Sequence, residues 1–581
     1  MMTSDTTYEL NDHERHESAS EKPALGKNGP DEAKIGSDMS STIDEIVYIQ
    51  GAKFWLISVA PRSIAIIMFL VNLEVPVVIT ALVSITSDLK GFENVAWVVA
   101  SYLLGYVGLY KPAFVSYALS SAVAPGIIVI CAKFSDIFGR KLVFVLSIGI
   151  FIIFSIACSA AQTLTQLIIF RALQGIGGGG SWSLATIFVS ELVPPENYPK
   201  FVANISLINA LALLLGPIIG GAIASNTTWR WIFIINIPIA VPALLIILYV
   251  VPKDFPYHNQ PGYEQKTLKD LMSKSVLDRI DVPGTILILF ATLGLTAAFE
   301  EADKRFPWKS AYVITLLTIS GLLWIILLVW ERYVTLSDNT IREPILPWRF
   351  LLNREMMGVL LNFIFLGGPT VICMFVLPQR FQLVYGTSGL DAGVRLIPFS
   401  AVIPVGSIFA SILGGKHKVP PVYLLIFGSV LQVLGFALIA TLPSTLEIPS
   451  QIYGFQVLAG FGCGINFSLL FIIIPLINEK RDSAVGLGAG SQFRFIGSSI
   501  VLSVSTSVFN TYVKPQLNSQ LGISDPDALT QLLPTFAPSV QDAIRHVLAT
   551  GYSRQIIVLA VSAGLQIPAT LLMWKKKQLK L

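Results

Sequence analysis

Residues 215–223 read LGPIIGGAI and lie in the middle of an apolar run, residues 201–225, that is long enough to cross a membrane. Pro217 removes a backbone hydrogen-bond donor and weakens the helix locally. Gly216 and Gly220 are four residues apart, so they share one helix face, and with Gly221 they let a second helix approach closely. A membrane helix with these features is bent or tightly packed, which favours a membrane protein whose helices move.

The composition of the whole chain agrees with a membrane protein. Of its 581 residues, 53% are hydrophobic and 13% are charged, whereas soluble domains carry about 25% charged residues. The sequence therefore predicts an all-α polytopic membrane protein. The four cysteines fall inside apolar runs and the five histidines outside them, which disfavours a disulfide framework and a membrane-embedded histidine metal site. We expect no metal and no nucleic-acid partner.

Fourteen stretches are apolar enough and long enough to be membrane spans. They are residues 60–82, 97–131, 142–160, 164–184, 201–225, 231–251, 282–299, 312–330, 357–377, 392–413, 420–441, 452–475, 484–508 and 554–573. Between and around them we expect a disordered cytosolic tail without a cleavable signal peptide (1–50), cytosolic loops (252–280 and 331–355), an extracellular loop that holds a short helix (509–553) and a basic cytosolic tail (576–581).

The distribution of Lys and Arg predicts the orientation of the spans. With both termini in the cytosol, the inner loops carry most of these residues, including Lys133, Arg140 and Arg279, and the outer side carries few, including Arg380. Asn226 begins an Asn-Thr-Thr glycosylation sequon on the outer side, but it lies so close to the membrane that we expect it to stay unmodified.

The 97–131 stretch is too long for one helix and too short for two spans with a loop. Removing Gly105–Ser120 would leave an ordinary span, whereas two short spans would invert every later loop against the charge pattern. We therefore interpret residues 105–120 as an insertion that arises from a gene-model error such as an unspliced intron. If these residues are present in the protein, the second span is distorted.

The loop AKFSDIFGRK, residues 132–141, lies between the second and third spans. Gly139 permits a tight turn, and Asp136 can interact with the start of the next helix or with Arg140. The simpler interpretation is that Arg140 and Lys141 only anchor the loop on the cytosolic side.

Arg171 lies several residues inside the fourth span, in LIIFRALQGIGG (167–178). A buried arginine in a membrane is costly and needs a partner or an aqueous cavity, unless it extends to the interface. Glu74 of the first span, at the same depth, is the natural partner. This pair either titrates during function or is a purely structural ion pair.

In this order, these segments resemble the signature motifs of the major facilitator superfamily. The 132–141 loop is similar to its inner-loop motif, Arg171 with Gln174 and Gly175 to its fourth-span motif, and GPxxGG at 216–221 to the fifth-span motif of drug:proton antiporters. The segments WRWIFIINIP (229–238), LPQRFQ (377–382) and AGVRLIP (392–398) are typical of its fourteen-span drug:proton antiporter family. The resemblance covers about residues 55–575 and is closest to fungal toxin and multidrug efflux pumps.

The chain departs from the family pattern at three places. Ala132 replaces the first glycine of the loop motif, and Glu74 followed by Pro76 stands where the family usually has Asp and Thr. The insertion at 105–120 has no counterpart in the family. Glu74 is still an acidic residue, so proton coupling stays one of the alternatives.

The resemblance implies a major facilitator fold of two six-helix bundles, residues 51–251 and 356–575, joined by two extra membrane helices in 281–330. It further implies proton-driven export of a lipophilic toxin, secondary metabolite or drug by a monomer in the plasma membrane or the vacuolar membrane. Glu74 and Arg171 would couple transport to protons, and Asp136 and Arg140 would latch the inner gate. Gly216, Pro217, Gly220 and Gly221 would shape the fifth helix for close packing.

Other polar residues in the spans either line a cavity or bond helix to helix. They are Asn209, Asn362, Gln379, Gln382, Asn466 and Gln492. The glycine run 177–180 lacks the Lys-Ser/Thr of a phosphate loop, so we expect no ATP site and no cofactor, only a proton gradient as the energy source. Two alternatives stay open, namely proton-coupled uptake of a siderophore or nutrient, and a transport-defective product caused by the insertion.

Overall fold

The structure is a computed structural model that describes residues 53–89, 127–192, 198–252, 278–303, 306–337, 342–443, 445–521 and 536–576, together with the single residues 255, 273 and 578. The predictions about the tail 1–50 and the insertion 105–120 lie outside the described residues. So do most of those about the loop 252–280 and the tail 576–581.

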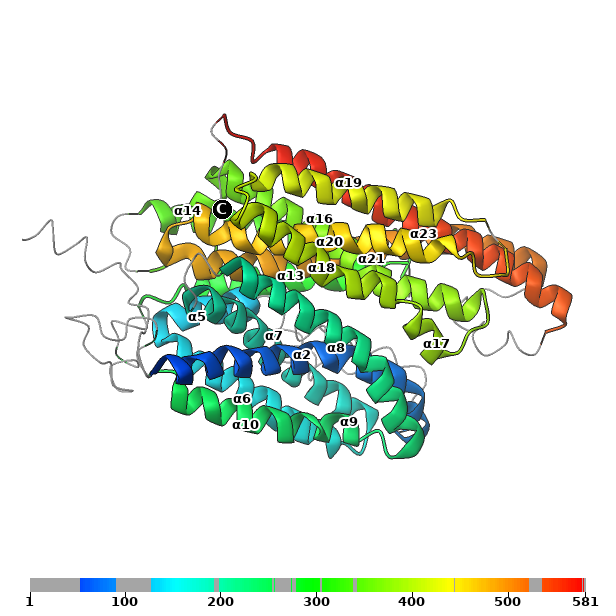
Figure 1. Ribbon diagram of the computed structural model, residues 1–581, viewed down its shortest axis with the longest axis horizontal. Helices are drawn as coiled ribbons and strands as arrows, with labels where there is room; N and C mark the ends of the chain where they lie inside the picture. Colours follow the sequence, from blue (N-terminus) through cyan, green and yellow to red (C-terminus); the bar gives the residue numbers. More distant parts are fainter. Residues whose placement is uncertain are drawn as a thin grey trace, which may run out of the picture. The chain divides into compact units, whose positions relative to one another are not determined.

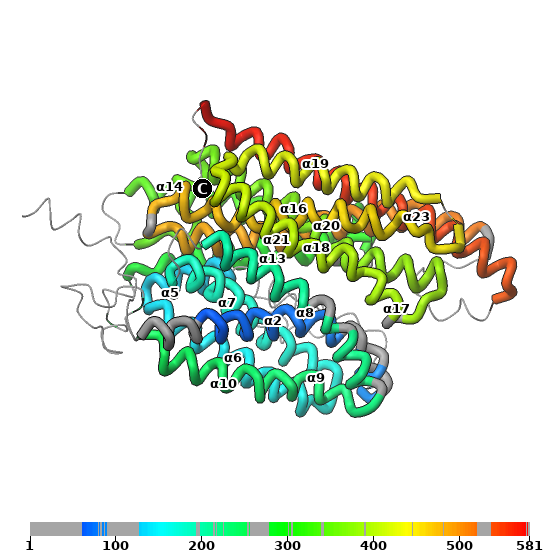
Figure 2. Tube along the Cα trace, viewed as in Figure 1, coloured from blue at the N-terminus to red at the C-terminus, as the bar shows by residue number. Residues whose placement is uncertain are grey.

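The first half of the described chain is a group of helices that lie side by side (Figures 1 and 2). They are α2 (Lys53–Leu89), α5 (Ile127–Phe138), α6 (Arg140–Ser159), α7 (Leu164–Leu192), α8 (Tyr198–Asn226), α9 (Trp231–Ile234) and α10 (Asn236–Val250). Of the second predicted span, only the end is described, as part of α5.

The second half begins with a helical hairpin, α13 (Val282–Glu301) and α14 (Ala311–Leu336), and continues as a second group of helices (Figure 1). These are α15 (Trp348–Leu352), α16 (Arg354–Leu383), α17 (Gly389–Val394), α18 (Ile397–Gly415), α19 (Pro421–Ala440), α20 (Gln451–Ile477), α21 (Lys480–Leu521) and α23 (Pro538–Leu571). The all-α prediction is confirmed for the described residues.

In the described part of the chain, 11 helices are long and apolar enough to cross a membrane. The helices α7 and α8 are not among them, although each has 29 residues and so exceeds the length that a span needs. The chain is thus a multi-pass membrane protein, and the count of fourteen spans stays a prediction.

Three helices extend far beyond their predicted spans into the predicted loops 331–355 and 509–553. The helix α14 continues to Leu336, α21 continues to Leu521, and α23 begins at Pro538. The extension of α21 is held by the turn between α13 and α14, because Asn510 Nδ2 and Lys514 Nζ donate to the Asp303 carbonyl at 3.1 and 3.2 Å. The helix can therefore continue through polar residues, since Asn510 and Lys514 have a hydrogen-bond partner in that turn.

The buried apolar side chains form three clusters. One cluster contains residues from both halves, including Ile128 and Val202 of the first half and Phe471 of the second. The other two each belong to a single half, one around Val78 and Phe233 and one around Phe381 and the helices α21 and α23. The two halves therefore share a core at the predicted cytosolic end and keep separate cores at the other end.

Candidate functional site: a buried charge pair and an inner gate

The Glu74 carboxylate lies at the centre of the first bundle and is almost completely buried, as is Arg171. Its Oε1 accepts hydrogen bonds from Arg171 Nη1 at 2.5 Å and Gln174 Nε2 at 3.1 Å, and its Oε2 accepts one from Asn236 Nδ2 at 2.7 Å. Three helices, α2, α7 and α10, thus contribute to one site. The structure brings together the two charges that the sequence paired.

Neighbouring side chains position this site. Arg171 Nη1 also donates to Gln174 Oε1 at 2.9 Å, and its guanidinium lies 5.5 Å from the centre of the Phe233 ring. Gln174 Nε2 donates to Ser155 Oγ at 2.7 Å. Such a network holds the carboxylate in one geometry, and a change in the charge of Glu74 would be felt by α6, α7 and α10 together.

Gln174 and Asn236 are site residues that the sequence analysis quoted but gave no role. Each belongs to a segment that the family resemblance had singled out, 167–178 and 229–238. Their presence in those segments was the only signal available, since a buried amide in an apolar helix commonly bonds helix to helix.

The four antiporter-motif residues all lie in α8, which packs on α2. A Cβ added to Gly216 would lie 2.5 Å from Pro76 Cγ and 2.6 Å from Pro76 Cβ, whereas a Cβ at Gly221 would meet nothing within 4 Å. Gly216 therefore lets α8 contact α2 two residues from Glu74. The close packing predicted for this helix is therefore found at Gly216, near the charge pair, and the prediction is wrong for Gly221.

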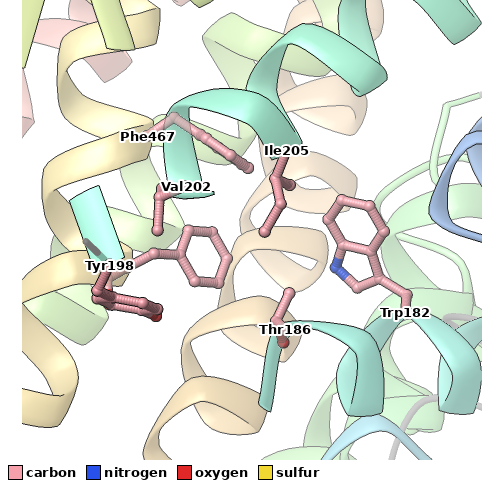
Figure 3. Close-up of a pocket in the computed structure, with 7 residues that line it drawn as sticks. Trp182, Thr186, Tyr198, Val202, Ile205 and Phe467 are labelled. Atoms are coloured by element: carbon pink, nitrogen blue, oxygen red, sulfur yellow. The ribbon is translucent and has the colours of Figure 1, made fainter. Parts of the chain in front are cut away.

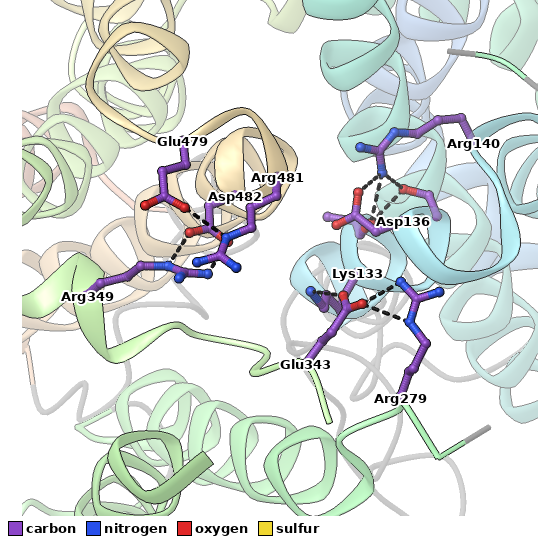
Figure 4. Close-up of polar contacts among 11 residues, drawn as sticks. Lys133, Asp136, Arg140, Arg279, Glu343, Arg349, Glu479, Arg481 and Asp482 are labelled. Atoms are coloured by element: carbon purple, nitrogen blue, oxygen red, sulfur yellow. Dashed lines mark hydrogen bonds and ion pairs between the residues drawn. The ribbon is translucent and has the colours of Figure 1, made fainter. Parts of the chain in front are cut away.

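At the predicted cytosolic end, Arg140 lies among three oxygen-bearing side chains (Figure 4). It forms an ion pair with Asp136, another with Glu191 Oε1 at 2.8 Å, and a hydrogen bond to Ser135 Oγ at 2.6 Å. Gly139, with a φ of 98°, makes the turn that places Arg140 at the start of α6. This φ favours glycine over every other residue.

Lys141 contacts the end of α10 and so fastens the loop within the first bundle. Its Nζ donates to the carbonyls of Leu248 at 2.7 Å and Val251 at 2.6 Å, a favourable place for a cation because the last carbonyls of a helix lack partners. Glu191, which the sequence analysis did not name, is the second carboxylate of the gate. It is 51 residues from Arg140 in sequence, and nothing local marked it.

A second set of ion pairs joins this gate to the linker after α14. Glu343 accepts from Lys133 Nζ at 2.6 Å and from Arg279 Nε at 2.9 Å, so it lies between the two cations (Figure 4). In the second half, Arg349 of α15 pairs with Asp482 of α21 in the same way, with Nη2 to Oδ1 at 2.8 Å. Ion pairs therefore connect neighbouring elements in both halves at this end.

Burial raises the pKa of the Asp136 and Glu191 carboxyl groups, and Arg140 acts to lower it. Replacing Arg140 with methionine should therefore destabilise the protein by on the order of 2 kcal/mol, because two buried carboxylates lose their cation. Thermal unfolding of the detergent-purified protein measures this loss.

Lys141→Met is the matched control, since it removes a neighbouring cation that bonds to the backbone carbonyls of Leu248 and Val251 and should cost less. If Arg140→Met unfolds at the temperature of the unchanged protein, Arg140 does not hold the gate.

A small cavity lies where α7 and α8 of the first half face α20 of the second (Figure 3). Its walls are mainly aromatic and aliphatic: Trp182, Thr186, Tyr198, Val202, Ile205, Phe467 and Phe471. It holds about 10 Å³ of space for the centre of a water molecule, which is room for about one water. In this conformation the interface is closed around a narrow apolar space.

Direct bonds also join the two halves near this cavity. Ser407 Oγ donates to Ser206 Oγ at 2.9 Å and Ser411 Oγ donates to the Pro199 carbonyl at 3.0 Å. Ala132, one of the departures from the family pattern, packs against α21, where a Cβ at Gly488 would lie 3.0 Å from its methyl group. In this structure the two halves are therefore in direct contact at this end.

The six polar residues predicted either to line a cavity or to bond helix to helix are dispersed. Asn362 and Asn466 are buried and bond to other helix residues, with Thr570 Oγ1 donating to Asn362 Oδ1 at 3.1 Å and Asn466 Nδ2 donating to Gln566 Oε1 at 2.7 Å. Gln492 is buried and Asn209 is half-buried, whereas Gln379 and Gln382 are exposed. None of the six lines the interface cavity of Figure 3.

Two residues that the charge pattern predicts on the outer side also have notable positions. Arg380 is completely buried in α16, so its predicted place in a loop is wrong. Its guanidinium lies 6.0 Å from the centre of the Tyr385 ring. Asn226 is exposed at the end of α8, and its glycosylation stays untested.

Two helix groups that meet at a closed interface, with a charge pair buried in one of them, define a membrane transporter and not an enzyme. A family model described as Major Facilitator Superfamily matches residues 64–502. The chain therefore belongs to the major facilitator superfamily.

Individual relatives agree with this assignment. The MFS-type transporter FPY5 of Fusarium mangiferae is 35% identical over 539 residues, which cover 92% of this chain and 86% of that protein. The efflux pump mlcE of Penicillium citrinum is 26% identical and covers 87% of each chain. Multidrug resistance protein 3 of Bacillus subtilis is 28% identical and covers 78% of this chain and 82% of its own.

Solved structures support the fold alone. The human organic anion transporter MFSD10 superposes with a TM-score of 0.52 at 15% identity, covering 90% of this chain and 100% of that one. The proton:xylose symporter XylE also gives 0.52 at 15% identity, covering 90% and 96%. The major facilitator fold predicted from the motifs is thus confirmed.

Proposed function

We propose that this protein exports lipophilic small molecules from the cytosol in exchange for protons. The observation that carries the proposal is the Glu74 carboxylate, which is buried among Arg171, Gln174 and Asn236 in the bundle that faces the interface. A buried carboxylate beside a cation can exchange its charge for a proton and shift the packing of the helices that hold it.

The lining of the interface cavity supports a lipophilic cargo. Its aromatic and aliphatic side chains offer little to a strongly polar molecule, and its only side-chain polar groups are on Trp182, Thr186 and Tyr198. Because the space is narrow in this state, cargo would enter only after the halves have moved apart. Two of the relatives are named as an efflux pump and a multidrug resistance protein, which favours export.

The proton gradient would supply the free energy for export. A proton that enters across about 100 mV gains about 2.3 kcal/mol from the voltage, and this free energy would drive the return of the carrier. We place the protein in the plasma membrane or the vacuolar membrane as a monomer, with both termini in the cytosol and with no cofactor.

The decisive experiment measures cellular accumulation of a panel of lipophilic compounds in a pump-deficient fungus that expresses the protein with and without residues 105–120. We expect accumulation of at least one compound to fall and to return to the control level after a protonophore. Glu74→Gln is the matched control, which should be present in the membrane but should not lower accumulation.

Higher accumulation would instead indicate uptake, and no change with either form would indicate a transport-defective product. Both results would overturn the proposal.

A further inference from the structure

Asp281 and Glu331 are two acidic residues at the base of the α13–α14 hairpin, outside the charge pair and the Arg140 gate. Asp281 immediately precedes α13, and Glu331 lies in the last turns of α14. Both are buried, with 1% and 0% of their surface exposed. The predicted cytosolic loop 331–355 is wrong at Glu331, because α14 is longer than predicted and contains this residue.

The two carboxyl groups converge on one point. A Cβ added to Gly284 would contact Asp281 Oδ2 and would lie 2.9 Å from Glu331 Oε1. The other oxygen of Asp281, Oδ1, accepts from Trp330 Nε1 at 2.8 Å and from the Gly284 amide at 3.0 Å. Asp281 Oδ2 and Glu331 Oε1 therefore lie within about 5 Å of each other.

Within the described part of the chain, Asp281 Oδ2 and both oxygens of Glu331 lack a hydrogen bond of normal geometry. The backbone amides of Ile345 and Leu346 face Glu331 without making such a bond. Two buried carboxylates this close cannot both ionise at low cost. One proton between them would remove one charge and supply the missing donor.

We propose that Asp281 and Glu331 form a proton-binding site that holds a single shared proton at the base of the α13–α14 hairpin. This site goes beyond the proposed export function, because proton binding here needs neither a cargo nor the Glu74 pair.

The cations around the pair favour its ionised form, against the effect of burial, and connect it to the ion pairs of the inner loop. Lys133 of α5 acts on both carboxyl groups and Arg342 acts on Asp281. The other charged groups on neighbouring elements are engaged elsewhere: Arg279 and Glu343 with each other, Arg332 over the Trp348 ring, and Arg349 with Asp482. Lys133 is the cation that the pair shares with Glu343.

Loss of the shared proton would therefore reach the inner gate. A second negative charge at Asp281 and Glu331 would compete with Glu343 for Lys133, whose Nζ lies 2.6 Å from Glu343 Oε2. The linker that follows α14 would then be held less tightly against α5. Burial raises the pKa of Asp281 despite the hydrogen bonds from Trp330 and Gly284, which agrees with a proton retained above the ordinary carboxyl range.

Infrared difference spectroscopy of the purified protein in lipid nanodiscs tests this site directly. A protonated buried carboxyl group gives its own C=O stretching band, and we expect Glu331→Gln to remove one such band at neutral pH. The matched control is Asp278→Asn, an exposed acid three residues before Asp281, which should leave the spectrum unchanged.

A second variant keeps the proposal testable if Glu331→Gln folds poorly. Trp330→Phe removes a donor that stabilises the Asp281 carboxylate, so the band should persist to a pH about one unit higher. Retention of the full band in Glu331→Gln, or a band in Trp330→Phe that titrates as in the unchanged protein, would overturn the shared proton. Neither of these two infrared measurements uses a substrate. A failed export assay would therefore not contradict the proposed proton-binding site.

Discussion

Replacing Arg171 with alanine is expected to abolish transport and to destabilise the first bundle by about 3–5 kcal/mol. The variant leaves the Glu74 carboxylate buried without its cation, since Arg171 Nη1 is the charged donor to Glu74 Oε1 at 2.5 Å. Gln174 and Asn236 would still donate to the carboxylate, but neutral amides cannot balance its charge. Thermal unfolding in detergent and compound accumulation in cells measure the two effects.

A double variant separates the effect on stability from the effect on proton-coupled transport. Glu74→Gln with Arg171→Met removes both charges, so the double variant should recover most of the stability that Arg171→Ala loses, because no unpaired charge is left in the core. It should still fail to transport, since no titratable group remains at the site.

If the double variant transports in a protonophore-sensitive way, Glu74 is not the coupling carboxylate. If Arg171→Ala is both stable and active, the pair has neither role.

The sequence predicted this pair because membrane burial leaves few solutions for an arginine. Arg171 stands inside an apolar run, Glu74 lies at a similar depth in another, and a low-dielectric setting makes their pairing favourable. The inner-loop motif was predictable for a similar reason, because Asp136, Gly139 and Arg140 are close in sequence and act through a tight turn. The cost of burying a charge in the membrane was sufficient to predict the pair, and the spacing along the chain was sufficient to predict the inner-loop contacts.

The residues that the sequence did not predict depend on tertiary contacts. Glu191 reaches Arg140 only because the end of α7 returns to the start of α6, and Glu343 reaches Lys133 only because the linker after α14 folds back. Arg380 and Glu331 lie near predicted span ends, where the charge rule places such residues in water. The structure buries both, because the helices extend past the apolar runs and pack on one another.

Replacing Gly216 with alanine is expected to remove most transport and to cost about 1–3 kcal/mol of stability. The added methyl group would lie 2.5 Å from Pro76 Cγ, and a proline ring cannot rotate away. The helices α8 and α2 must then separate next to Glu74, which would disturb the Arg171 and Asn236 contacts. Accumulation assays measure the loss of transport, and thermal unfolding measures the loss of stability.

Gly221→Ala is the matched control on the same helix. It has the same change in composition and helix propensity, but its methyl group would meet nothing within 4 Å, so near-normal transport is expected. Pro76→Ala combined with Gly216→Ala should restore part of the activity, because removing the ring reopens the contact. Equal effects of the two glycine variants, or no rescue by Pro76→Ala, would show that the fifth-span motif acts by some means other than the α2–α8 contact.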